Sequence, residues 1–324
     1  MATARIVATW PLTPHAVERL REVAGTIEDV SRDNLSIEQL AKRLEDADAI
    51  ITFPLAIRFD RELLSHCKNL KVIATVSVGY DNIDLGVCAE RGVKVGNTPG
   101  VIAPDTADIG MALILVTMRR VVAGLDFVRK GEFERGEIAP YGNALNRKTL
   151  GIFGMGGVGA ALAHRARAAG MNVIYHNRSR RNDIDPTEAT YVSFDDLLAT
   201  SDVIAVTAPL TPQTRGVFGK DAFAKMKRGA YFVNVARGGL VQTDALYEAL
   251  KSGHLAYAGL DVTDPEPLPL SHPLYSLENV IVTPHIGTQT PETRDEMLEL
   301  AVSNVIAALR GETLPAPVPL PVPT

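Results

Sequence analysis

The chain has 324 residues, 46% of them hydrophobic, and its 33 basic and 38 acidic side chains leave a formal net charge of −5. This composition excludes a disordered chain, and the length predicts two domains. A weakly acidic protein lacks the clustered Lys and Arg with which nucleic-acid binders displace counterions from phosphates, so small molecules are the expected partners.

In the first hundred residues, short β-branched runs alternate with amphipathic segments. The runs are almost continuously apolar, as are strands of a parallel sheet that is buried on both faces. The expected strands are Arg5–Trp10, Ala49–Thr52, Val72–Val76 and Lys94–Gly96. Between them, apolar side chains at helical spacing predict helices over Pro14–Ala24 and Ser36–Leu44. This part of the chain therefore predicts one α/β domain.

A second series of the same kind follows a long helical pattern. The pattern runs from Thr106 to about Lys130 and predicts one buried helix. The strands expected after it are Thr149–Phe153, Asn172–Tyr175, Asp202–Val206, Ala230–Val235, Ala256–Asp261 and Asn279–Thr283. A last helix is expected over Pro291–Leu309, and the proline-rich segment after it predicts an extended arm or a disordered tail.

The sequence shows no feature of export or of membrane insertion. No basic region followed by an apolar core stands at the N-terminus, and the longest apolar stretch, Ile109–Met118, is far shorter than the roughly 20 residues of a spanning helix. The two cysteines, Cys67 and Cys88, match neither a disulfide framework nor a metal site. We expect a cytoplasmic protein, with buried thiols and no metal ligands.

A glycine-rich turn predicts a dinucleotide site. The segment Gly154-Met155-Gly156-Gly157-Val158-Gly159 follows an expected strand and opens an expected helix. The first glycine allows the tight turn, the second lets the backbone approach a pyrophosphate, and the third lets helix and strand pack closely. The alternative is a packing turn without a ligand, but the strand and helix around the glycines favour dinucleotide binding.

The residues after the next strand favour NADP over NAD. NAD-binding proteins place an acidic residue there to bind the ribose 2′-hydroxyl, whereas this chain has Asn177, Arg178, Ser179 and Arg180, with Asp183 as the first acid. Arginine and serine donors suit a 2′-phosphate. A solvated basic loop is the other interpretation of this segment.

Three later strand ends each carry one ionisable residue in an apolar or turn-like setting. Arg237, Glu266 and His285 lie in the segments 234–239, 261–267 and 283–288. Because the carboxyl ends of parallel strands face the ligand crevice, we expect these loops to converge. Arg237 would bind a carboxylate, His285 would move a proton, and Glu266 would orient the imidazole and favour its protonated form. Each residue alone also fits a structural role.

These motifs, in this order, resemble the D-isomer-specific 2-hydroxyacid dehydrogenases. The resemblance extends upstream to Val78-Gly79-Tyr80-Asp81-Asn82-Ile83-Asp84 and to Asn97-Thr98-Pro99-Gly100, so it covers nearly the whole chain. It implies two doubly wound parallel-sheet domains, in which a Rossmann coenzyme domain is inserted into a flavodoxin-like substrate domain, and a homodimer formed through the coenzyme domains. The expected boundaries are 1–100 with 287–324 for the substrate domain and 101–286 for the coenzyme domain.

The resemblance also implies roles for individual residues. Backbone amides of Val78 and Gly79 would bind the substrate carboxylate. Leu55, in the apolar segment 53–55, is expected near the substrate, although this segment fits the core equally well. Cofactor contacts are expected from the glycine turn, from residues 177–180, and from Thr106, Ala208, Pro209, Thr214, Val235, Ala236, Asp261 and Gly287. Arg178-Ser179-Arg180 is similar to the corresponding segment of NADPH-dependent glyoxylate/hydroxypyruvate reductases, although the tryptophan that many of them carry is missing from residues 132–146.

The sequence thus predicts an enzyme that reduces a small 2-oxo acid, glyoxylate or hydroxypyruvate, to the D-2-hydroxy acid with NADPH, the proton coming from His285. Two alternatives stay open. One is a reductase of the same family for 2-ketogluconate or another 2-oxo acid. The other is a non-catalytic module that senses NADP(H), which the full set of Arg, Glu and His disfavours.

Overall fold

A computed structural model describes residues 4–54, 57–185 and 187–322. The chain forms two compact units: unit 1 runs to Ile102 and resumes at Thr290, and unit 2 spans Ala103–Gln289. The chain therefore crosses between the units twice.

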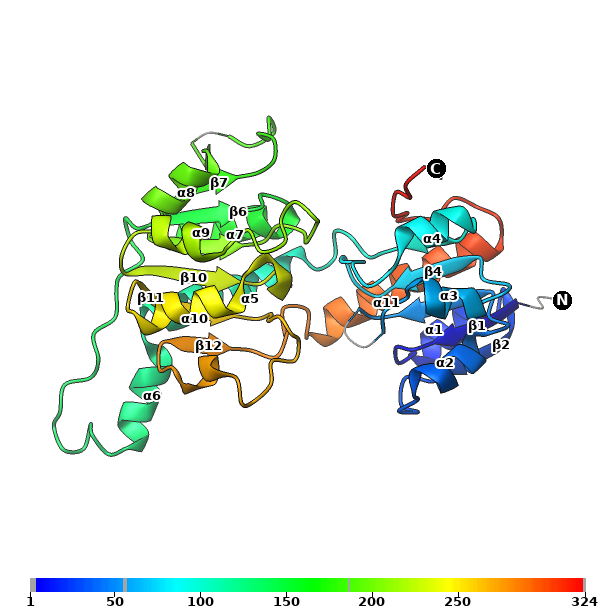
Figure 1. The fold of residues 1–324 in the computed structure, drawn as a ribbon, viewed down its shortest axis with the longest axis horizontal. Coiled ribbons are helices and arrows are strands. Elements are labelled where there is room, and N and C mark those ends of the chain that lie inside the picture. The colour runs from blue at the N-terminus through cyan, green and yellow to red at the C-terminus, as the bar shows by residue number, and fades with distance from the viewer. Residues whose placement is uncertain (1–3, 55–56, 186, 323–324) are drawn as a thin grey trace. The chain divides into compact units, whose positions relative to one another are not determined.

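Unit 1 is a five-stranded parallel sheet with helices on both faces (Figure 1). Its strand order, β2-β1-β3-β4-β5, is the flavodoxin-like order that the sequence predicted. The strands are β1 (Ala4–Ala8), β2 (Ala24–Asp29), β3 (Ala49–Thr52), β4 (Val72–Thr75) and β5 (Lys94–Gly96). The helices are α1 (Pro14–Leu20), α2 (Ile37–Leu44), α3 (Arg61–His66), α4 (Leu85–Glu90) and α11 (Pro291–Leu309). Apolar side chains of α1 and α11 cover one face, and those of α2, α3 and α4 cover the other.

Unit 2 is a seven-stranded parallel sheet of order β12-β11-β10-β9-β6-β7-β8. The order reverses between β6 and β9, which confirms the doubly wound architecture. The strands are β6 (Thr149–Phe153), β7 (Asn172–His176), β8 (Thr190–Tyr191), β9 (Val203–Val206), β10 (Ala230–Asn234), β11 (Leu255–Leu260) and β12 (Val280–Val282). The helices are α5 (Ala103–Met118), α6 (Val121–Arg129), α7 (Gly157–Ala168), α8 (Phe194–Thr200), α9 (Lys220–Lys225) and α10 (Thr243–Lys251), with short 3₁₀ turns at Gly238–Leu240 and Pro273–Ser276.

Each face of the sheet in unit 2 has its own apolar core. Side chains of α5 and α7 pack on one face, and those of α8, α9 and α10 pack on the other. The central strands β6, β9 and β10 are buried on both sides, as their continuous apolar sequences predicted. Such a sheet is rigid and leaves the loops at its carboxyl edge free to carry ligands.

The prediction of one long helix over residues 106–130 is wrong in one respect, because this segment forms two helices, α5 and α6. Arg120 adopts a left-handed backbone with φ 52°. The Met118 carbonyl accepts a hydrogen bond from the Asn143 amide at 2.7 Å. In a continuous helix that carbonyl would accept from the residue four positions on, so the returning segment 142–143 satisfies the end of α5 instead.

The sequence also missed β2. This strand lies at the edge of the sheet, and its residues are mostly half-buried or exposed. An edge strand of this kind needs no continuous apolar run, so the pattern that located the central strands gave no signal.

The proline-rich segment near the C-terminus is an extended arm, one of the two predicted alternatives. It lies along β5, where Gly96 and Pro317 form an antiparallel bridge and the Val318 amide donates to the Val95 carbonyl at 2.8 Å. Leu314, Ala316 and Val318 are buried there. The arm therefore covers an edge strand that would otherwise be open to pairing with another chain.

Both cysteines are buried and free, as predicted. Burial raises the pKa of the Cys67 and Cys88 thiols to about 11, so both stay protonated and unreactive near neutral pH. Among the helices of the described residues, none combines the length and apolarity needed to cross a bilayer.

Candidate active site

The glycine turn of unit 2 connects β6 to α7, and two of its glycines are required by packing. Gly154 has φ +107°, and a Cβ there would lie 2.4 Å from the Ala208 amide nitrogen. A Cβ on Gly159 would lie 2.4 Å from the Gly154 carbonyl oxygen. Around Gly156 no described atom lies within 4 Å of such a Cβ. The turn is thus packed against the protein at Gly154 and Gly159 and open at Gly156, where a pyrophosphate could approach the protein backbone.

The amino end of α7 is a set of unused donors. Gly156 caps the helix without a side-chain bond, and no described residue accepts from the amides of Gly157, Val158 or Gly159. Exposed helix N-termini of this kind bind phosphate groups. The turn and the helix therefore fit the pyrophosphate of a dinucleotide.

Met155 shapes this turn through bonds to the protein. Its amide donates to Asn177 Oδ1 at 2.6 Å, and its carbonyl accepts from Arg181 Nη1 at 2.9 Å. Arg181 also forms an ion pair with Asp183. The first acid after β7 is therefore occupied by a neighbouring arginine.

Arg178, Ser179 and Arg180 follow β7 and are exposed. Within the described ranges, the side chains of Arg178 and Arg180 make no hydrogen bond or ion pair. Two arginines and a hydroxyl at the end of the second strand of a Rossmann sheet fit a ribose 2′-phosphate.

The other expected cofactor residues also lie at the carboxyl edge of this sheet. Thr106 Oγ1 donates to the Gly287 carbonyl at 3.1 Å, and Thr214 Oγ1 donates to the Pro209 carbonyl at 2.8 Å. Ala208 packs against Gly154. Val235 and Ala236 directly follow β10. The two hydrogen bonds fix the backbone of the loops that follow β9 and β12.

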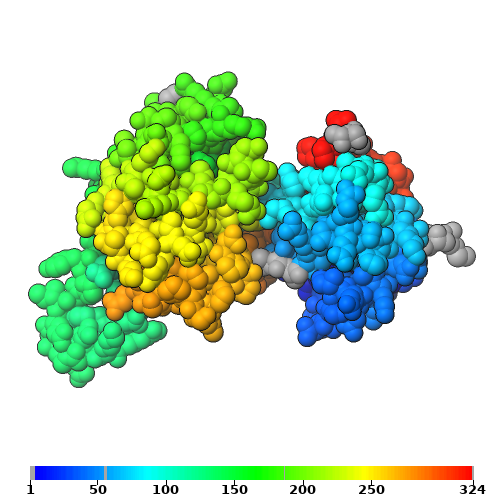
Figure 2. Space-filling model, in the orientation of Figure 1, coloured from blue at the N-terminus to red at the C-terminus, as the bar shows by residue number. Residues whose placement is uncertain are grey.

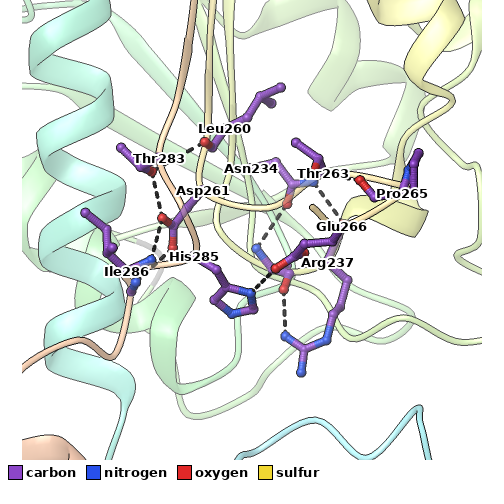
Figure 3. Close-up of polar contacts among 12 residues, drawn as sticks. Asn234, Arg237, Leu260, Asp261, Thr263, Pro265, Glu266, Thr283, His285 and Ile286 are labelled. Carbon is purple, nitrogen blue, oxygen red and sulfur yellow. Dashed lines mark hydrogen bonds and ion pairs between the residues drawn. The ribbon is translucent and has the colours of Figure 1, made fainter. Parts of the chain in front are cut away.

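Glu266 and His285 are brought together in the structure. The Glu266 Oε1 atom lies 2.5 Å from Nδ1 of His285, and both side chains are mostly buried (Figure 3). An imidazole held at Nδ1 by a carboxylate presents Nε2 on its other side. The pair has the geometry of a proton donor and the group that orients it.

Asp261 holds the loop that carries His285. Its carboxylate is buried and accepts from the Thr283 hydroxyl at 2.6 Å and from the Ile286 and Gly287 amides, each at 2.8 Å (Figure 3). His285 itself has φ 54°, a left-handed backbone that an unsupported loop would rarely keep. Both carboxylate oxygens of Asp261 are thus engaged by the protein.

A second set of bonds holds the loop of Arg237 after β10. Asn234 accepts from the Ala236 amide at 3.0 Å and donates to the Arg237 carbonyl at 2.9 Å (Figure 3). A Cβ on Gly238 would lie 1.9 Å from the Thr263 carbonyl oxygen, so this loop packs directly on the segment that leads to Glu266. The three ionisable residues thus follow three adjacent strands, β10, β11 and β12.

In unit 1, the loop after β4 presents two backbone amides. The carbonyl of Ser77 accepts from the Thr98 amide, that of Val78 from Asn97 Nδ2, and that of Gly79 from Ser77 Oγ. No described residue accepts from the amides of Val78 or Gly79. With the carbonyls bound to the protein, these two N–H groups are available to an anion.

The segment after β3 was assigned both to the substrate and to the core. Phe53 is buried and stacks on Trp10 with ring centroids 4.4 Å apart. The Arg294 guanidinium lies over both rings, at 4.8 and 5.0 Å from their centroids. Leu55 lies outside the described residues.

Comparisons with known proteins agree with this arrangement. A family model described as the NAD binding domain of D-isomer specific 2-hydroxyacid dehydrogenases matches residues 111–287. A glyoxylate reductase of Thermococcus litoralis is 42% identical over 282 residues, which are 85% of each chain. The chain belongs to the D-isomer specific 2-hydroxyacid dehydrogenase family.

Solved structures of this dehydrogenase family match over nearly the whole chain. A glyoxylate reductase from Paecilomyes thermophila has a TM-score of 0.90 at 36% identity and covers 98% of this chain and 99% of its own. An NADPH-dependent glyoxylate/hydroxypyruvate reductase from Sinorhizobium meliloti, in complex with NADP and malonate, has a TM-score of 0.87 at 30% identity, with coverage of 99% and 98%.

Several residues that hold this dehydrogenase site were not assigned from the sequence. Asn234 and Asn97 bind backbone carbonyls, those of Arg237 and Val78, and Thr283 donates to the carboxylate of Asp261. Asn and Thr are frequent in loops generally, so the residue type alone does not indicate such a role. The position of these residues next to the motif residues is the signal that could have identified them. Among the described residues, no group of His, Cys, Asp and Glu is placed to hold a metal ion.

Proposed function

We propose that this dehydrogenase reduces a small 2-oxo acid, glyoxylate or hydroxypyruvate, to the D-2-hydroxy acid with NADPH. The observation that carries the proposal is the contact of 2.5 Å between Glu266 and His285, which pairs a proton donor with an orienting carboxylate. The relatives named for glyoxylate and hydroxypyruvate reduction supply the substrate class.

Residues of this chain have separate roles in substrate binding and in proton transfer. Arg237 binds the substrate carboxylate through its planar fork of donors, assisted by the amides of Val78 and Gly79. His285 donates a proton from Nε2 to the carbonyl oxygen, and Glu266 stabilises the imidazolium through Nδ1. When bound, NADPH would supply the hydride for the carbonyl carbon, so that the C=O group of the substrate would become CH–OH.

Initial-rate measurements test this function. The purified protein is assayed with NADPH and with NADH against glyoxylate, hydroxypyruvate, pyruvate and 2-ketogluconate. We expect the highest kcat/KM with NADPH and one of the first two acids. A preference for 2-ketogluconate would show that the enzyme is a reductase of the same family with a different substrate. Binding of NADPH without turnover of any 2-oxo acid would refute the proposed reaction.

The preference for NADPH rests on Arg178, Ser179 and Arg180. Replacing Arg178 with alanine removes a charged donor from the proposed 2′-phosphate site, so we expect the KM for NADPH to rise by about 10-fold or more. The KM for NADH, which has no 2′-phosphate, should stay nearly unchanged. Arg228→Ala, at an exposed position of the same unit, is the control and should leave both values as they are.

We further propose that the enzyme forms a homodimer through unit 2. Helix α6 and the segment after it project from the rest of this unit (Figure 2). They expose large apolar side chains: Val121, Val122, Leu125, Val128, Phe133, Ile138 and Tyr141. An exposed apolar patch of this kind is typical of a protein–protein interaction surface. Sedimentation velocity should give twice the monomer mass, and a concentration-independent monomer would contradict the dimer.

A further inference from the structure

The loop formed by residues 77–79 reaches its conformation through side chains far away in sequence. All three of its carbonyls accept hydrogen bonds from the protein, as described above. A peptide unit whose carbonyl is fixed has its amide fixed in the opposite direction, since the unit is planar. Whatever fixes these carbonyls therefore also aims the N–H groups of the loop.

Asn97 is the central member of this arrangement. Its Nδ2 donates to the Val78 carbonyl at 2.8 Å, and its side chain is almost fully buried. Its own amide donates to the Ala316 carbonyl at 3.2 Å. Asn97 thus touches the loop with its side chain and the C-terminal arm with its backbone.

Asn304, on α11, completes the connection. It is fully buried, donates from Nδ2 to the Asn97 carbonyl at 3.1 Å, and accepts from the Ala316 amide at 3.0 Å. A Cβ at position 96 would lie 2.7 Å from Asn304 Cγ, so Gly96 leaves the space that this side chain occupies. A buried polar side chain whose bonds are all satisfied holds its neighbours in a single arrangement.

We propose that Asn97 and Asn304 are positioning residues for the substrate carboxylate. They fix the peptide unit between Val78 and Gly79 so that the Gly79 amide points toward the anion, and they make the arm around Ala316 a part of this support. The Val78 amide beside it is fixed through the Ser77 carbonyl, which accepts from the Thr98 amide. The inference rests on the proposed function, because it assigns the carboxylate to these amides.

The test measures carboxylate binding and nucleotide binding separately. Asn97→Asp keeps the shape of the side chain but replaces its donor with an oxygen, which repels the Val78 carbonyl. We expect the KM for glyoxylate and the inhibition constant of oxalate to rise by about 10-fold or more, because displaced binding groups lose catalysis steeply. The KM for NADPH should not change. Asn304 contacts Asn97 and not the loop itself, so Asn304→Asp should raise the same two constants by a smaller factor.

Two further variants separate positioning from stability. Asn97→Ser removes the amide without placing a charge in a buried site, and it replaces Asn97→Asp if that protein does not fold. Ser36→Ala removes the capping box of α2 in the same unit and should lower the melting temperature without changing the constants for glyoxylate or oxalate. Folded Asn97 variants that bind glyoxylate and oxalate like the wild type would overturn the inference.

Failure of the proposed function would look different. A wild-type protein that turns over no 2-oxo acid refutes the reaction, and oxalate binding in the presence of NADP is then measured by calorimetry. Weaker binding to the Asn97 variants would still support the positioning role. Equal binding to all variants, or no binding even to the wild type, would overturn it.

Discussion

Replacing His285 with asparagine is expected to lower kcat for glyoxylate by at least about 100-fold, since the variant has no group that can protonate the carbonyl oxygen. Asparagine is the suitable replacement because it tolerates the left-handed backbone found at this position, φ 54°, better than alanine does. The loop that Asp261 holds should therefore stay in place. Steady-state kinetics at saturating NADPH measure the effect.

Two controls accompany this variant. His164→Asn changes an exposed histidine on α7 and should leave kcat unchanged. The dissociation constant of NADPH, measured by the quenching of protein fluorescence, should stay within about twofold of the wild-type value in the His285 variant. His285 is assigned to proton transfer and not to nucleotide binding. Turnover close to the wild-type value would remove His285 from the mechanism.

Replacing Arg237 with alanine is expected to lower kcat/KM for glyoxylate by about 100- to 1,000-fold, since losing one partner of a charge-assisted pair costs about 2–5 kcal/mol. Most of the loss should appear as a higher KM, accompanied by a lower kcat because the substrate is also misplaced. Lysine at this position keeps the charge but lacks the planar fork, so Arg237→Lys should fall between alanine and the wild type.

The nucleotide provides the internal comparison for Arg237. Its loop is held by backbone bonds to Asn234, which the substitution leaves in place, so the KM for NADPH should change little. An equal rise in the constants for NADPH and glyoxylate would indicate a collapsed loop. An unchanged kcat/KM for glyoxylate would show that another group binds the carboxylate.

The sequence predicted the parts of the fold that depend on burial. Central strands such as Val203–Val206 are apolar throughout because helices cover both faces, and α11 follows from its proline start and glycine stop. The edge strand β2 and the break at Arg120 were missed. Both depend on contacts with distant segments, and local patterns do not record such contacts.

In the candidate site, the sequence proposed residues for the chemistry but named few of the residues that hold them in place. Glu266 and His285 were recognised from their type and spacing, and the structure places them in contact. The expected contact of Asp261 with the cofactor stays a prediction, and the structure shows a further role, since its two oxygens hold the loop of His285. A role of that kind depends on where backbone amides point, which no residue pattern states.

The divided course of the chain through unit 1 also bears on how the protein folds as it is synthesised. Unit 2 is one continuous segment, whereas the sheet of unit 1 is covered on one face by α11, which supplies Leu298, Ala301, Val302 and Val305 to its core. The first hundred residues therefore leave the ribosome without the helix that completes the core on one face of their sheet. They must wait until nearly two hundred further residues have been made, so nascent unit 1 is the part of this enzyme with the greatest need of chaperones.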